Sequence, residues 1–217
     1  MKAHLEYLKY VLRHKWFVFK ACLRLGVPLH LAVFHDWTKF TPSEWSAYVR
    51  SFYNPDGSKR RQRDASGYYD PIKISDAFSL AWFHHEKHNK HHWGYWVIIS
   101  GSGGKERFLI QSHGDGYPMY IYDNLLGMRM TPLIDDELGG PNYKELKAMA
   151  TWLNSVAPEP LPMPEVYARE MVADWVGAGM AINGVSNPQA WYTSNREKML
   201  LHPKTRVFVE ELLSSLR

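Results

Sequence analysis

Five of the chain's eleven histidines crowd into residues 82–93, WFHHEKHNKHHW, a density that points to metal chemistry. They are His84, His85, His88, His91 and His92. Residues three or four apart on a helix face the same way, so pairs among the first three can aim at one point. The last two can reach that point from a turn beyond Asn89. The alternative is a polar helix end that packs between Trp82 and Trp93.

Further candidate metal ligands lie at three other places in the chain: His14, the adjacent pair His35-Asp36, and Asp174. The His-Asp pair directly follows the apolar run LHLAVF. An ionised Asp beside a His at the end of a buried helix is costly unless a positive charge meets it. A divalent cation can bind both, because imidazole and carboxylate are its common ligands. Since Cys22 is the only cysteine, any metal must be held by His and carboxylate groups.

The composition predicts one globular domain spanning residues 1–217, because 45% of the residues are apolar and 14% are aromatic. Charged residues interrupt every apolar run before it reaches membrane length. We therefore expect a cytoplasmic protein with no membrane partner. The net charge of +4 is partly concentrated at residues 59–63, KRRQR. Such a run is most often a solvated loop, and contact with nucleic acid or phosphate is the less favoured interpretation.

Apolar periodicity predicts helices at about 5–25, 29–39, from 42, from 70, 141–156, 165–179, from 188 and 203–216. The apolar face of the first helix is expected to be formed by Leu5, Leu8, Leu12, Phe19 and Leu23. The second helix is apolar nearly all round, so we expect it to be central. Residues 41–44, TPSE, are typical of a capping box in which Glu44 reaches back to the helix start.

The pattern of apolar residues changes from residue 95 onward. Short strands are expected at 96–99 and 107–110, joined by a glycine-rich turn, and 117–122 could add a third. The turn, SGSGG, lacks the spacing of a phosphate-binding loop. The predicted fold is therefore a mainly α helical bundle with a small β-rich insertion at about 95–160.

The order of the candidate ligands resembles the HD-domain superfamily of metal-dependent phosphohydrolases, which are helical proteins. An early helical His14, the doublet His35-Asp36 after an apolar helix, and a late helical Asp174 follow the superfamily order. The residues after the doublet, up to Lys39, look like the HD-x-x-K variant of its motif. More closely, HDWTKFTPSEW, HHEKHNKHHWGYW and LPMPEVYAREMVADW resemble an uncharacterised family of bacterial and phage proteins. That family brings no established activity, so only the superfamily implies a mechanism.

The resemblance implies one or two divalent metal ions, drawn from Mn, Mg, Zn, Co or Fe. The ligands it implies for the first are His14, His35, Asp36 and Asp174. Several branches of the superfamily bind a second metal with extra histidines between the doublet and the last Asp. The candidate ligands for that metal are His84, His85 and His91, with the last two favoured.

The resemblance also implies roles in catalysis. The candidate catalytic residues are Asp36, Lys39 and Glu170. The candidate substrate-binding residues are Lys39, His88, His92 and Arg169. The expected activity is hydrolysis of a nucleotide or other phosphate ester by a metal-activated water, with nucleic acid as a less favoured partner. The alternatives are a diiron oxygenase of HD type that acts on a small organic substrate, and a non-catalytic, metal-stabilised binding protein.

Overall fold

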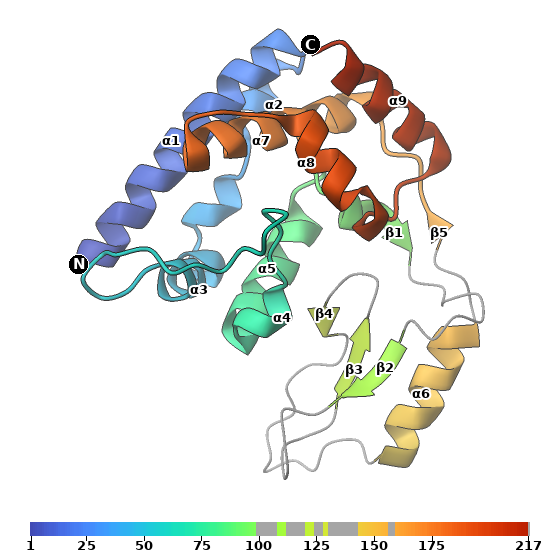
Figure 1. The fold of residues 1–217 in the computed structure, drawn as a ribbon. Helices are drawn as coiled ribbons and strands as arrows, with labels where there is room; N and C mark the ends of the chain where they lie inside the picture. The colour runs from blue at the N-terminus through green and yellow to red at the C-terminus, as the bar shows by residue number, and fades with distance from the viewer. Residues whose placement is uncertain (99–107, 112–119, 124–127, 130–142, 156–158, 217) are drawn as a thin grey trace.

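The computed structural model describes residues 1–98, 108–111, 120–123, 128–129, 143–155 and 159–216. In this part of the chain the fold is mainly helical, with small antiparallel sheets in the region of the expected insertion (Figure 1). The predicted fold class is confirmed. Among the described residues, no helix is long and apolar enough to cross a membrane.

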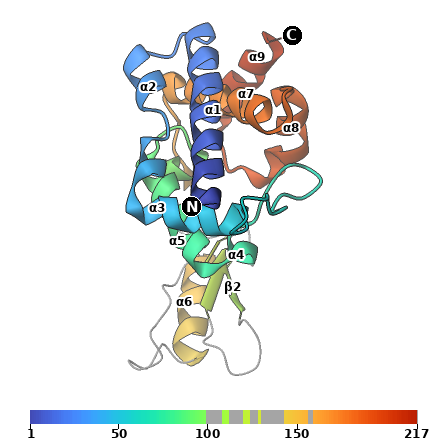
Figure 2. The same ribbon diagram turned by 90° about the vertical axis from the view of Figure 1, so that its left-hand side faces the viewer.

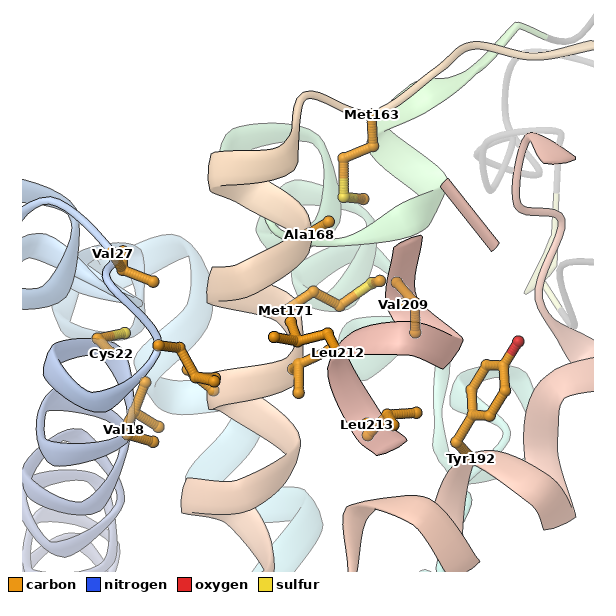
Figure 3. Close-up of a cluster of buried hydrophobic side chains, with 14 of the residues drawn as sticks. Val18, Cys22, Val27, Met163, Ala168, Met171, Tyr192, Val209, Leu212 and Leu213 are labelled. Atoms are coloured by element: carbon orange, nitrogen blue, oxygen red, sulfur yellow. The ribbon is translucent and has the colours of Figure 1, made fainter. Parts of the chain in front are cut away.

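The core is built where the first and a late helix meet, α1 (Lys2–Arg24) and α7 (Glu165–Asn183). Helix α9 (Pro203–Ser214) packs on α7, and Figure 3 shows Val18 of α1, Met171 of α7 and Leu212 of α9 in one apolar cluster. Gly177 allows the close approach of α1 and α7, since a β-carbon there would lie 2.3 Å from Val18 Cγ2. This packing brings the middle of α1 against the middle of α7.

The buried face of α1 is not the leucine face that the sequence predicts. The buried residues of α1 are Ala3, Tyr7, Val11, His14, Val18, Ala21 and Cys22. Leu5, Leu12 and Leu23 are all more than half exposed. Alanine, valine and cysteine are smaller than leucine, so their face permits the close contact with α7 that the core requires.

The second helix, α2 (Leu29–Phe34), is shorter and more exposed than expected. It ends before His35, and Phe34 is 65% exposed (Figure 2 shows α2 beside α1 at the edge of the molecule). Asp36 takes the left-handed conformation, with φ of 55°, which no helix interior accommodates. A short 3-10 helix, η1 (Trp37–Phe40), follows it.

Helices α3 (Pro42–Phe52) and α5 (Asp76–His88) pack side by side, with the single turn α4 (Pro71–Ile74) before α5. The predicted capping box is wrong. The Thr41 hydroxyl donates to the Thr38 carbonyl at 2.6 Å, and the Glu44 side chain is fully buried toward α5. After α5 comes the 3-10 helix η2 (Trp93–Trp96).

The strands pair differently from the expected hairpin. Strand β1 (Val97–Ile98) pairs with β5 (Glu159–Pro160), so the chain enters and leaves the insertion at one place. Strands β2 (Phe108–Gln111), β3 (Tyr120–Asp123) and β4 (Met128–Arg129) form a second sheet beside α6 (Tyr143–Ser155). The predicted glycine-rich turn lies outside the described residues.

The C-terminal third follows the prediction more closely. Helix α7 runs four residues beyond the expected end and stops at Gly184, which has a positive φ of 76°. Helix α8 (Pro188–Asn195) begins after Asn187, whose side chain accepts a hydrogen bond from the Ala190 amide. A 3-10 helix, η4 (Arg196–Lys198), connects it to α9.

Candidate metal centre

Four segments distant in sequence bring imidazole and carboxylate groups together at one place. His14 comes from the buried face of α1, and His35-Asp36 comes from the turn after α2. His85 lies in the last turn of α5, His91 lies just beyond that helix, and Asp174 comes from α7. The left-handed Asp36 turns the chain sharply, so two adjacent residues both reach the site.

The first group surrounds one oxygen of Asp36. His14 Nε2 lies 3.1 Å from Asp36 Oδ2 and 3.2 Å from Asp174 Oδ1. His35 Nε2 lies 3.4 Å and 3.5 Å from the same two oxygens. These four side chains each offer a ligand atom within 4.8 Å of all the others.

The second group surrounds the other oxygen of the same carboxylate. His85 Nε2 lies 3.2 Å from Asp36 Oδ1, and His91 Nε2 lies 3.4 Å from it. His92 belongs to this group as well, with its ring centroid 4.3 Å from that of His91. Asp36 is therefore shared between two sets of possible ligands, one for each oxygen.

Several ligand atoms of these side chains lack a hydrogen-bond partner, as expected of atoms that would bind a metal. Asp36 Oδ1 and the Nε2 atoms of His35, His85, His91 and His92 have no hydrogen-bond partner in the described part of the chain. All are buried, where an unpaired polar atom is costly. Ligands about 2.1 Å from a shared ion lie about 3.0–3.5 Å from one another. The buried clusters therefore have the composition and spacing to hold divalent ions.

Carboxylates on the far side of the imidazoles fix their orientation. His85 Nδ1 donates to Glu44 Oε2 at 2.9 Å, and His35 Nδ1 donates to Glu170 Oε1 at 3.0 Å. His91 Nδ1 lies 3.3 Å from the same Glu170 oxygen. This is the arrangement typical of metal-binding histidines, in which the second ring nitrogen donates to a carboxylate.

Charge pairing dominates the electrostatics of these buried groups. Burial disfavours the charged forms of His35 and Asp36, but their attraction outweighs it and raises the pKa of His35 well above its usual value. The pKa of Asp36 is held well below its usual range by His35 and Lys39. Burial, together with the neighbouring His91 and His85, lowers the pKa of His92 well below its usual value. His92 is therefore a neutral imidazole, the form that can ligate a metal.

Three predicted site residues are not brought to this centre. His84 points to Glu44, with Nδ1 2.8 Å from Oε1, because it lies on a different face of α5 from His85. His88 is exposed and stacks on His84 with ring centroids 4.0 Å apart. Arg169 lies five residues before Asp174, so it faces the other side of α7, donates to the Leu25 carbonyl and covers the ring of Phe208.

Two predicted catalytic residues differ in their placement. Lys39 is 13% exposed and its ammonium group contacts Asp36 Oδ2, so it is part of the site. Glu170 is buried beside His35 and His91, where it can hold both imidazoles in place, and these three side chains also offer ligand atoms within 4.8 Å of one another. Glu44 was missed because its motif also fits a capping box. Glu44 lies four residues before Tyr48, and this spacing could have placed Glu44 on the buried face of the helix.

A cavity of about 780 Å³ opens beside the centre. His14, His85, His91, His92 and Asp174 line it together with Lys39. The basic loop, residues 59–63, also lines the cavity, and so do many aromatic rings. The cavity therefore gives a ligand simultaneous access to the candidate metal ligands, to cations and to flat apolar walls.

No curated protein and no solved structure matches the chain. A family model does match residues 3–109 and 150–215, which include every candidate ligand and leave out most of the insertion. The chain therefore belongs to a family of unknown function, DUF5662.

Proposed function

We propose that the protein is a metal-dependent phosphohydrolase that acts on a nucleotide or another phosphate ester. The observation that carries this proposal is the sharing of Asp36, which presents Oδ2 to His14 and His35 and Oδ1 to His85 and His91. Two adjacent ions held by one carboxylate suit the displacement of a leaving group from phosphorus. The ligand order that resembles the HD-domain superfamily supports the same reaction class.

Divalent ions bound there would polarise a phosphoryl oxygen and lower the pKa of a water molecule toward neutrality. The chain's own residues prepare the site. Glu44 and Glu170 hold the imidazoles with Nε2 directed at the centre. Lys39 compensates the charge of Asp36 and lies on the cavity wall, where its ammonium group can attract a substrate phosphate.

The charge of the cavity supports an anionic substrate. Lys59 and Arg61, both exposed in the basic loop, line the cavity that contains the candidate ligands. Neither side chain makes a hydrogen bond or ion pair within the described residues. Unpaired cations at a cavity wall favour phosphate groups, which arginine can bind through two parallel hydrogen bonds.

The proposal is tested by hydrolysis of a panel of phosphate esters, from p-nitrophenyl phosphate to nucleotides, by the metal-loaded protein. Asp36→Asn should lower kcat by at least about a thousandfold, because it weakens both groups at once. His30→Ala is the control, since His30 is exposed and belongs to neither group of candidate ligands. A metal-loaded protein that hydrolyses no member of the panel would contradict the proposal.

A further inference from the structure

Glu86 is a buried carboxylate that the proposed reaction does not use. It follows His85 on α5, is 4% exposed and lines the cavity. Within the described residues it makes no hydrogen bond or ion pair, although almost every other buried carboxylate near the centre is paired with an imidazole. Its carboxylate oxygens are accessible from the cavity, where a ligand can supply the donor that the described residues do not.

Neighbouring residues fix the position of the Glu86 carboxylate. A β-carbon on Gly94 would lie 2.2 Å from Glu86 Oε1 and 2.8 Å from Oε2, so the carboxyl group fits only against the bare backbone of a glycine. Lys87 Nζ donates to the Gly94 carbonyl at 2.6 Å and ties η2 to the end of α5. The adjacent lysine is thus engaged with the backbone and makes no ion pair with Glu86.

The other residues that line the cavity indicate which chemical groups a ligand would have. Tyr68, Trp82, Trp93 and Trp191 line it, and aromatic faces stack on flat rings. Five of the candidate metal ligands and the basic loop line this cavity and suit phosphate. A flat ring that donates N–H groups and also carries a phosphate is a nucleotide.

We propose that Glu86 recognises the N–H donors of a nucleobase, with guanine as the base that satisfies both carboxylate oxygens. Guanine presents an imino N–H and an amino group side by side, which two carboxylate oxygens can accept in parallel. The inference rests on the proposed function for the placement of the phosphate at the metal centre. It adds a specificity-determining residue and a base to that reaction.

The test is binding of GMP and of ribose 5-phosphate to the manganese-loaded protein, measured by quenching of tryptophan fluorescence on rapid mixing, before any turnover. Glu86→Gln should weaken GMP binding about ten- to a hundredfold, the loss expected for a hydrogen bond to a charged group. Ribose 5-phosphate binding and metal content should not change. Gly94→Ala should act in the same direction by displacing the carboxyl group, whereas Glu211→Gln, on the exposed face of α9, should have no effect.

Equal GMP affinity in the wild type and Glu86→Gln would overturn the inference. So would wild-type protein that binds GMP no better than ribose 5-phosphate, or a variant that weakens both ligands alike. Glu86→Gln keeps the size of the side chain, so it serves even if Gly94→Ala does not fold. GMP binding that depends on Glu86, without hydrolysis of any phosphate ester, would retain the inference and reject the proposed function.

Discussion

Two carboxylates, Glu44 and Glu170, orient different histidines of the centre. Single substitutions of the two can therefore show which histidines serve which ion. Glu44 accepts from His85 and from His84, which belongs to neither group of ligands, whereas Glu170 contacts both His35 and His91. Each group of ligands therefore depends on a different set of supporting contacts.

We expect Glu44→Gln to weaken binding of one ion about ten- to a hundredfold and to leave the other ion's affinity nearly unchanged, because only the second group loses its support. Glu170→Gln should weaken both ions. Competition titration against a chelator measures the two affinities. Equal weakening of both sites by Glu44→Gln would contradict the division of ligands described here.

Glu86 gives the metal-free protein a defined pH dependence. Burial raises the pKa of Glu86 to about 7 from an ordinary value of 4.5. Between these two values the folded state binds more protons than the unfolded state, so the contribution of Glu86 to stability falls as pH rises through this window. A pKa raised from 4.5 to about 7 corresponds to about 3 kcal/mol at most.

Glu86→Gln cannot titrate, so it should gain stability relative to the wild type as pH rises from 5 to 8, by up to about 3 kcal/mol. Urea unfolding of both metal-free proteins at the two pH values measures the difference. A difference that does not change with pH would show that Glu86 is ionised normally in the folded protein.

At the scale of elements, the contact between α1 and α7 positions His14 against Asp174. A methyl group at Gly177 would collide with Val18, including its backbone nitrogen at 2.6 Å, so the helices must separate. We expect Gly177→Ala to lower the free energy of unfolding by about 1–3 kcal/mol despite the better helix propensity of alanine. Metal affinity should fall as well.

Gly179→Ala is the matched control on the same helix. Its nearest contacts would be 3.1 Å from Ser186, in the segment after α7, and it does not touch α1. Chemical denaturation and metal titration of both variants give the comparison. If Gly177→Ala is as stable as the wild type and binds metal equally well, the close approach of the two helices does not organise the centre.

The sequence located most helices because their start signals are local. Asn187 before Pro188 is an example, since its side chain caps α8 as such a residue is expected to. The sequence misassigned the faces of α1 because leucines and small residues form two apolar stripes, and periodicity alone does not say which stripe meets α7. The sequence predicted too long a second helix because no residue near Asp36 is a signal that ends a helix.

Part of the centre could also be predicted from the residues. His14, His35, Asp36, His85, His91 and Asp174 were all candidates, and the structure brings them together. Glu44 and Glu86 could not be assigned in this way. The role of each depends on a partner from another element, α5 for Glu44 and the glycine of η2 for Glu86.

At the scale of the whole molecule, the candidate ligands connect α1, the turn after α2, the end of α5 and α7. Ions bound by these two groups would stabilise the folded state over the unfolded chain, which lacks the assembled sites. We expect metal loading to raise the free energy of unfolding by about 4 kcal/mol when the free ion is a thousandfold above its Kd. Thermal and urea unfolding, with and without chelator, measure this change.

Metal removal should leave most of the helical content, because the apolar cluster shared by α1, α7 and α9 does not include the ligands (Figure 3). Circular dichroism of the metal-free protein at low temperature checks this point. Complete loss of helical signal would mean that the ions drive folding and do not merely stabilise a folded core.

We propose above all that one shared carboxylate, Asp36, organises two metal sites for phosphate ester hydrolysis. Its most direct test is elemental analysis of the protein purified without chelator or nickel affinity resin, which counts and identifies the metal in each chain. We expect about two ions of Mn, Mg, Zn or Co per chain in the wild type and a loss of most of them in Asp36→Ala. No metal even after reconstitution, or full occupancy in Asp36→Ala, would contradict it, and two irons per chain would favour an oxygenase.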